Sequence, residues 1–314
     1  MKSLLKVIVS APGKIILSGE HAVVYGYPEV LSAIDKRLSV EIEETGSGLD
    51  VQPMEGRSLV EYAIEIIKIQ LNVSGLKNLK IRITSQIPIG SGLGSSAAFA
   101  VAITTAFFEF LKLPRSLKKI NEIAYEIERK QHGTPSGGDN TVSAYGGFLL
   151  YRKETEAFKV FSPLKTKVFP SIFLINSGKP EESTGEMIKI VKDLILRSSQ
   201  EAEKIFREME QITRNFLRFL SGEEQNFGDL ITRNERLLEQ LGVVSSKTKI
   251  LIQKIESIGG SAKISGAGGI KGNSGIILAY HQDPKVLLKL ANEEKIEMFK
   301  VKLGERGVKN EKII

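Results

Sequence analysis

One glycine- and serine-rich run, Pro88 to Ala98, constrains the fold of this chain more than any other stretch. An apolar segment, 97–111, follows it, and residues 79–85 before it alternate apolar and polar side chains, as a strand does. This order predicts a strand, a glycine-rich loop and a helix. A helix that begins in such a loop offers unpaired backbone N–H groups and the positive end of its dipole to an anion. The stretch is therefore typical of a phosphate cradle.

The spacing of these glycines excludes two common nucleotide motifs. No Gly-Lys-Ser/Thr follows them, so the run is not a P-loop, and it also lacks the Gly-x-Gly-x-x-Gly spacing. Glycines still let the backbone approach an anion closely, and hydroxyls at a helix start can bond phosphate or bind Mg²⁺. A plain connection between a strand and a helix is the alternative when the stretch is taken alone.

Composition is that of an ordinary globular protein. The 314 residues, 41% of them hydrophobic and 26% charged, suit two domains or one large domain. The absence of cysteine excludes disulfides, thiolate metal sites and a cysteine nucleophile, and it fits a reducing cytoplasm. The three histidines are scattered, which argues against a histidine-rich metal site.

Charge and hydropathy narrow the range of partners. The net charge of +7 is compatible with an anionic partner, but the basic residues form no block interleaved with aromatics. We therefore expect a solvated, lysine-rich surface and no nucleic acid partner. No run is long and apolar enough to cross a membrane, and the first ten residues predict a strand rather than a signal peptide.

Periodicity along the chain predicts an α+β fold whose second half has helices covering a small antiparallel sheet. Strands are expected at 7–10, 38–43, 79–85, 147–151, 171–176, 262–265, 275–280 and 296–302. Helices are expected at 58–71, 97–111, 117–130, from 183 onward, 199–220, 228–241, 246–258 and 284–292. Capping boxes at Ser58–Glu61 and Ser183–Glu186 mark two of the helix starts. A boundary near Ser162–Pro163 divides residues 1–163 from 164–314.

Two further segments place charged side chains beside glycine turns. Residues 11–26 contain Lys14, Glu20 and His21, and a lysine there could stabilise negative charge on oxygen or lower the pKa of a nearby hydroxyl. Glu128 falls near the end of a predicted helix, and Asp139 lies in or just after a turn-rich stretch. One carboxylate could hold Mg²⁺ while the other orients or deprotonates a hydroxyl. A surface turn and a chance pair of carboxylates are the alternatives.

The last glycine-rich segment, Lys263 to Gly275, lies between two predicted strands. A β-hairpin with a long loop explains it structurally, and a loop that approaches a phosphate explains it functionally.

Taken in this order, the four segments resemble those of the GHMP kinases and, within them, the mevalonate kinases. The likeness is carried by residues 11–26 (the N-terminal signature), 88–98 (the ATP-binding motif), 133–140 with 143–147 (the acidic motif) and 263–269 (the third motif). Weaker likenesses cover 176–187, 234–243 and 304–308. The resemblance implies an N-terminal domain like ribosomal protein S5 domain 2, residues 1–163, and a ferredoxin-like C-terminal α/β sandwich, residues 164–314.

The resemblance also implies an activity, the ATP-dependent phosphorylation of mevalonate to 5-phosphomevalonate in isoprenoid biosynthesis. Lys14 would assist the attacking hydroxyl, and Asp139 would be its general base or orienting carboxylate. Glu128 and Ser96, with Ser95 as the alternative serine, would hold Mg²⁺ between the β- and γ-phosphates. The nucleotide would contact Pro88, Gly90, Ser91, Gly92, Leu93, Gly94, Ser95, Ser96, Gly266, Ala267 and Gly268. Mevalonate would contact Lys14, Glu20, His21, Asp139 and Thr184.

The chain departs from the family at Ile270–Ser274, where the third motif usually continues as glycines. Lys271 in this insertion could add a cation near the phosphates. The departure leaves open a relative that handles phosphomevalonate, as a kinase or a decarboxylase, and a kinase of another small alcohol or sugar. A binding protein that lost catalysis is a further alternative, against which the retention of Lys14, Glu128 and Asp139 argues. The family also suggests a homodimer, and we expect a cytoplasmic enzyme.

Overall fold

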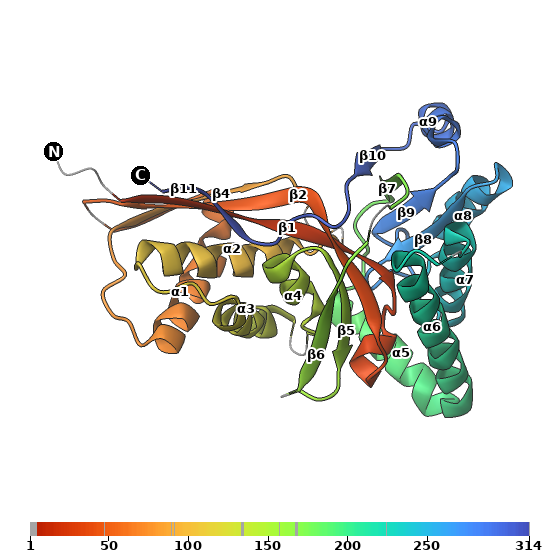
Figure 1. The fold of residues 1–314 in the computed structure, drawn as a ribbon, viewed down its shortest axis with the longest axis horizontal. Helices are drawn as coiled ribbons and strands as arrows, with labels where there is room; N and C mark the ends of the chain where they lie inside the picture. Colours follow the sequence, from red (N-terminus) through yellow and green to blue (C-terminus); the bar gives the residue numbers. More distant parts are fainter. Residues whose placement is uncertain are drawn as a thin grey trace.

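The computed structural model describes residues 5–46, 48–88, 90, 92–132, 135–156, 158–166, 169–223 and 225–313. Two sheets lie next to each other, each covered by its own helices (Figure 1). The first sheet lies above helices α1 to α4, and the second lies among helices α5 to α9. The structure therefore has the predicted α+β architecture, with antiparallel strands and helices in the second half.

The first sheet contains seven strands within the described residues, and its main path runs β11-β1-β2-β4-β3. Strand β5 also pairs with β2, and β6 pairs with β5. All pairings in it are antiparallel except that of β3 with β4. Its strands are β1 (Lys6–Ser18), β2 (Glu29–Glu44), β3 (Leu49–Gln52), β4 (Leu79–Ser85), β5 (Phe148–Lys153), β6 (Lys159–Leu164) and β11 (Lys309–Ile313).

Four α-helices belong to this first sheet: α1 (Arg57–Leu71), α2 (Ser95–Phe110), α3 (Leu117–His132) and α4 (Gly138–Tyr145). Helix α2 is buried on all sides and packs on β1 and β2, as its uninterrupted apolar sequence requires. Its two buried threonines are tolerated because each hydroxyl donates to a carbonyl one turn earlier, Thr104 to Ala100 and Thr105 to Val101. The core of the first half is therefore built around the helix that follows the glycine-rich loop.

The second sheet has the order β10-β7-β9-β8 and is antiparallel throughout. Its strands are β7 (Ile172–Asn176), β8 (Ser261–Ser265), β9 (Ile276–Tyr280) and β10 (Met298–Val301). The accompanying helices are α5 (Thr184–Arg197), α6 (Ser199–Leu220), α7 (Phe227–Gln240), α8 (Ser246–Ser257) and α9 (Pro284–Glu293). Short 3₁₀ turns at Ala22–Tyr25 (η1) and Met54–Gly56 (η2) complete the structure.

One of the two predicted capping boxes is confirmed. At the start of α5, the Ser183 hydroxyl accepts from the Glu186 N–H, and the Glu186 carboxylate accepts from the Ser183 N–H. The capping box expected at Ser58 is wrong, because the turn η2 runs directly into α1 and makes Gly56 the N-cap. Ser58 consequently lies inside the first turn.

Several short elements differ from expectation. The sequence did not predict β3, β6, β11 or the first part of β2, and it described the start of α4 as a turn. The proposed boundary near Pro163 falls within β6, and β11 returns to pair with β1 in the first sheet. The division between residues 163 and 164 remains a prediction. Among the described residues, no helix has the length and apolar character needed to span a membrane.

Candidate active site

Lys14 and Asp139, 125 positions apart in the sequence, meet in an ion pair. Lys14 Nζ lies 3.1 Å from Asp139 Oδ2; the lysine side chain is 3% exposed and that of the aspartate 33%. The ammonium group is thus taken out of water, while the carboxylate keeps access to an incoming molecule. A buried cation facing a partly open carboxylate suits a reaction in which an alcohol oxygen becomes more negative.

The local sequence Pro12-Gly13 places Lys14 in this position. The ladder between β1 and β2 shifts register between Pro12 and Lys14, so the Lys14 N–H donates to Leu93 O of the glycine-rich loop at 2.9 Å. A Cβ at Gly13 would lie 2.9 Å from the same carbonyl. Gly94, at φ 72°, passes close to the lysine stem, because a Cβ there would lie 2.7 Å from Lys14 Cγ. Glycines at both positions therefore let the loop close onto β1.

The start of α2 provides a hydroxyl beside a buried carboxyl. Helix α2 begins at Ser95 behind the αL residue Gly94, with no side chain capping its first N–H groups. The next residue, Ser96, hydrogen-bonds Glu128 of α3, which is 4% exposed. Burial raises the pKa of Glu128 to about 7, the charge of Asp139 adds to the rise, and the Ser96 bond and Lys14 oppose it.

These donors fit a magnesium ion. Mg²⁺ prefers hard oxygen ligands and is usually held by one or two protein groups plus phosphates and water. A serine hydroxyl next to a single carboxyl meets that requirement. The described residues contain no group of three or more acidic, histidine or cysteine ligands, as a metal cage made of protein alone would need.

Helix α4 carries Asp139 in its first turn, with Gly138 as its first residue. The Ser143 hydroxyl donates to Pro12 O at 2.9 Å, which fastens α4 to the strand that bears Lys14. The start of a helix favours a negative group, so the Asp139 carboxylate is stabilised by the helix end as well as by Lys14. The two helix starts, of α2 and α4, both lie next to Lys14.

The third motif reaches the same place from the second half of the chain. Ile16 N donates to Ser265 Oγ at 2.9 Å, and a Cβ at Gly92 would lie 3.1 Å from Ser265 O. His21 Nε2 lies 3.0 Å from Ala267 O, and its side chain is buried. Burial lowers the pKa of His21, against smaller raising effects of the Ala267 bond and of Glu20. All four motifs therefore converge on one site.

Glu20 is buried in a network that joins the two halves. Lys263 of β8 pairs with Glu20 Oε1, and Asn234 of α7 donates to Glu20 Oε2 at 3.1 Å. Lys263 also donates to Ile16 O at 3.2 Å. The Glu20–Lys263 ion pair thus links the segment after β1 to β8. Because both carboxylate oxygens of Glu20 are bonded to protein, its direct contact with a substrate stays a prediction.

The remaining predicted residues are placed as follows. Thr184 begins α5 and is exposed. Lys179, from the segment before α5, lies over the glycine-rich loop, where a Cβ at Gly90 would be 3.4 Å from its Cδ. Pro88 is half-buried. Ser91, Gly133 and Thr134 lie outside the described residues.

The insertion at Ile270–Ser274 is bonded to neighbouring segments. The backbone N–H groups of Ile270 and Lys271 donate to the Glu182 carboxylate, at 3.3 and 3.0 Å. Ser274 Oγ donates to Gly269 O at 3.0 Å and accepts from Ser245 N at the same distance. The insertion thus forms a loop held against the segment before α5.

Two buried carboxyls escaped the sequence analysis. Glu29 begins β2, and burial raises its pKa. The charge of Asp139 adds to the rise, and that of Lys14 opposes it. Glu235 on α7 accepts from Ile264 N at 2.9 Å, and burial raises its pKa to about 8. Glu29 belongs to no motif, and its only sequence signal is a charged residue in an otherwise apolar stretch, Pro28-Glu29-Val30-Leu31. Glu235 lies in the weak family likeness at 234–243 but was not singled out there.

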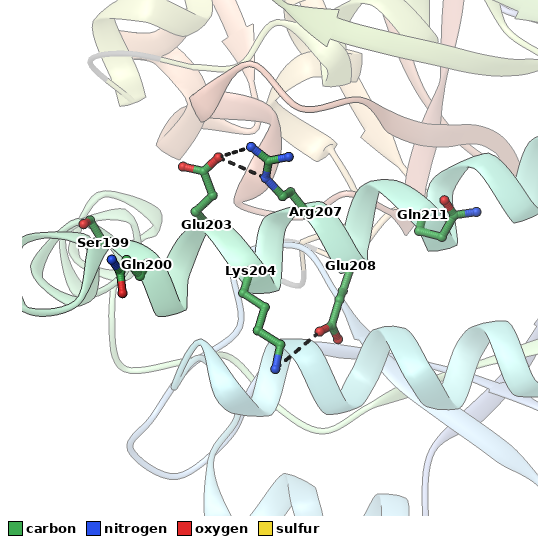
Figure 2. A pocket seen from close by; sticks show the side chains of 7 residues that line it. All are labelled: Ser199, Gln200, Glu203, Lys204, Arg207, Glu208 and Gln211. Atoms are coloured by element: carbon green, nitrogen blue, oxygen red, sulfur yellow. Dashed lines mark hydrogen bonds and ion pairs between the residues drawn. The ribbon is translucent and has the colours of Figure 1, made fainter.

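A hollow of about 550 Å³ lies along α6, away from these residues (Figure 2). Its lining comes entirely from α6, and its charged side chains pair along the helix, Arg207 with Glu203 at 2.7 Å and Lys204 with Glu208 at 4.0 Å. Exposed pairs at this spacing are typical of a solvated helix face.

Comparison with known proteins agrees with this geometry. Residues 58–147 match the GHMP kinases N terminal domain. The mevalonate kinase of Archaeoglobus fulgidus is 36% identical to this chain, over 83% of the chain and 89% of the relative. That of Thermococcus gammatolerans is 33% identical, over 84% and 87%. The chain belongs to the mevalonate kinase family of the GHMP kinases.

A solved structure of the same family supports this assignment over the whole chain. The crystal structure of L. major mevalonate kinase in complex with R-mevalonate is 26% identical, with a TM-score of 0.81 and 96% of each chain covered. The predicted α+β fold of the GHMP kinases is therefore confirmed, and the chain is a member of a family of ATP-dependent kinases.

Proposed function

We propose that this protein transfers the γ-phosphoryl group of ATP to the primary hydroxyl of mevalonate and so forms 5-phosphomevalonate. The observation that carries the proposal is the Lys14–Asp139 pair, closed in by the glycine-rich loop and lying at the start of α4. Phosphoryl transfer depends on positioning and charge neutralisation, which this arrangement supplies. The mevalonate kinase relatives favour this acceptor.

In the proposed reaction, Asp139 accepts the hydroxyl proton of mevalonate or orients that hydroxyl toward the phosphorus. Lys14 stabilises the growing negative charge on the attacking oxygen and pairs with the Asp139 carboxylate. Because Lys14 is 3% exposed, its charge is weakly screened by water and acts strongly on the nearby oxygen. Where Asp139 acts as the base, the proton removed from the alcohol ends on its carboxylate.

The nucleotide lies across the two helix starts in this proposal. The backbone from Gly90 to Ser96 binds the phosphates, and Gly266, Ala267 and Gly268 close the site from the other half of the chain. Glu128 and Ser96 would hold Mg²⁺, which when bound neutralises charge on the β- and γ-phosphates. Binding requires Glu128 to ionise, and its raised pKa means that the ion competes with a proton near neutral pH.

We expect mevalonate beside Lys14, in contact with His21 and Thr184. His21 is buried on Ala267 and would present its ring as an uncharged polar surface, because burial lowers its pKa. Glu20 acts through its ion pair with Lys263, which fixes the segment that bears His21. The homodimer and the cytoplasmic location stay predictions that rest on the family.

Purified protein tests the function directly. ADP release is measured by a coupled assay with Mg·ATP and, separately, mevalonate, phosphomevalonate, galactose or no acceptor. We expect turnover with mevalonate alone, and a loss of about 10²- to 10⁴-fold in kcat for Asp139→Asn. Asp50→Asn, on the exposed edge of β3, is the matched control and should keep full activity.

Three outcomes contradict the proposal. Preferred turnover with phosphomevalonate or a sugar would refute the acceptor, and wild-type turnover in folded Asp139→Asn would refute the role of the aspartate. Nucleotide binding without turnover on any of the alcohols would favour a regulatory protein instead.

A further inference from the structure

Glu29 is a buried acid in the wall behind the active site. It is the first residue of β2 and is 1% exposed. Its backbone is in register with Tyr151 of β5 on one side of the strand. Among the described residues, Glu29 Oε1 has no hydrogen-bond partner. A carboxyl at such a position is costly to bury, so its retention next to Asp139 calls for an explanation.

Glycines at two positions make room for this side chain. A Cβ at Gly19 would lie 2.5 Å from Glu29 Cα, so the backbone of β2 passes directly against the turn after β1. A Cβ at Gly138 would lie 2.2 Å from Glu29 Oε1, far inside any real contact. The carboxyl therefore fills the space in which a side chain at position 138 would stand.

Gly138 is the residue before Asp139, and both lie in the first turn of α4. The Glu29 carboxyl thus packs against the backbone that orients the Asp139 side chain. After Glu29 Oε1, the heavy atoms nearest to a Cβ at Gly138 are Leu31 Cδ1 and Glu29 Cδ, at 3.2 and 3.3 Å. Glu29 and Leu31 of β2 therefore support this side of the turn.

Burial is the main influence on the pKa of Glu29 and raises it well above its ordinary value. The charges of Asp139 and Glu20 raise this pKa further, and that of Lys14 lowers it. Burial also raises the pKa of Tyr151, and the charge of Glu29 adds to that rise.

We propose that Glu29 is a positioning residue for Asp139, matched in size to Gly138: its carboxyl supports the first turn of α4 and so holds the Asp139 carboxylate on Lys14. The proposal rests on the proposed function. It predicts that position 29 and position 138 compensate for each other, since one side chain can occupy the space that the other leaves.

The test compares kcat and KM of a set of variants with those of wild type. Glu29→Ala empties the space, and we expect kcat to fall roughly ten- to a hundredfold through misplacement of Asp139, with the KM for Mg·ATP unchanged. Glu29→Gln keeps the size and shape of the side chain and should stay within about threefold of wild type. Glu44→Ala, exposed at the far end of β2, is the control for a lost glutamate.

The decisive variant is Glu29→Ala combined with Gly138→Ala. The methyl group introduced at position 138 enters the space that Glu29 Oε1 occupied, so kcat should recover to within about threefold of wild type. Gly138→Ala alone displaces the carboxyl and should be as slow as Glu29→Ala. A general loss of folding would instead lower the fraction of active enzyme in every variant, which thermal unfolding and active-site titration measure.

A combined variant as slow as Glu29→Ala alone would overturn the proposal. A slow Glu29→Gln would also overturn it, because that result would show that the carboxyl itself is needed. Failure of the proposed function gives a different result, since wild type would then not phosphorylate mevalonate. The same variants are in that case compared with the alcohol that wild type accepts.

Discussion

Replacing Glu128 by Gln removes a buried carboxyl whose pKa, at about 7, lies above its ordinary value of 4.5. Between these two values the folded protein holds a proton on Glu128 that the unfolded chain has released. The free energy of unfolding therefore falls as the pH rises through this range, and the stabilisation is present in full only at the acidic end. The difference between 4.5 and 7 corresponds to about 3 kcal/mol.

The assay is urea unfolding of the nucleotide-free protein in a chelator, at pH 5, 6, 7 and 8. Glu29 and Glu235 also lie buried with raised pKa values, but both are present in wild type and variant and cancel in the comparison. We expect wild type to lose about 2.5 kcal/mol more than Glu128→Gln between pH 5 and pH 8, because part of the difference is already lost at pH 5. Glu122→Gln, exposed on the same helix, should follow wild type.

Parallel pH profiles for wild type and Glu128→Gln would refute this reasoning, because they would show that Glu128 has the same pKa in the folded and unfolded chains. The water that reaches the site would then have to screen Glu128 far more than its burial indicates. A wild-type profile that rises from pH 5 to pH 7 relative to the variant would show a lowered pKa instead.

Two further substitutions test the packing around the site. Lys263→Met leaves Glu20 buried without its cation, so we expect the free energy of unfolding at pH 7 to fall by about 3 to 5 kcal/mol. Urea unfolding measures this loss. A loss below about 1 kcal/mol would mean that the ion pair is hydrated. Gly94→Ala places a Cβ 2.7 Å from Lys14 Cγ at a residue with positive φ. We therefore expect kcat, measured with Mg·ATP and mevalonate, to fall by at least about tenfold. An unchanged kcat would show that the glycine-rich loop can move away from Lys14.

The sequence predicted the second sheet and its helices almost to the residue. Helix α6 spans the expected 199–220, because its apolar side chains repeat at helical spacing along its whole length. The first sheet and its helices were harder to predict. Strand β11 is short and pairs with β1 from the other end of the chain, and no local pattern identifies such a partner. Helix α4 begins behind one glycine and with another, which by propensity favour a turn.

The site was predictable where its chemistry lies in motifs. Lys14, Ser96, Glu128 and Asp139 were found because glycines or a helix start accompany them, and the structure brings them together. The ion pair of Glu20 with Lys263 could not be found, since the partners are 243 positions apart. Both residues lie in predicted motifs, but only the packing of the two sheets makes them neighbours.

Strand β1 has a consequence for how this enzyme opens. At one end it lies between β2 and β11, and at the other Ile16 bonds both Ser265 and Lys263 of the second sheet. The strand that carries Lys14 is therefore also a link between the two halves. Because a swing of one half away from the other would break those bonds, we expect substrates to enter by displacement of surface loops.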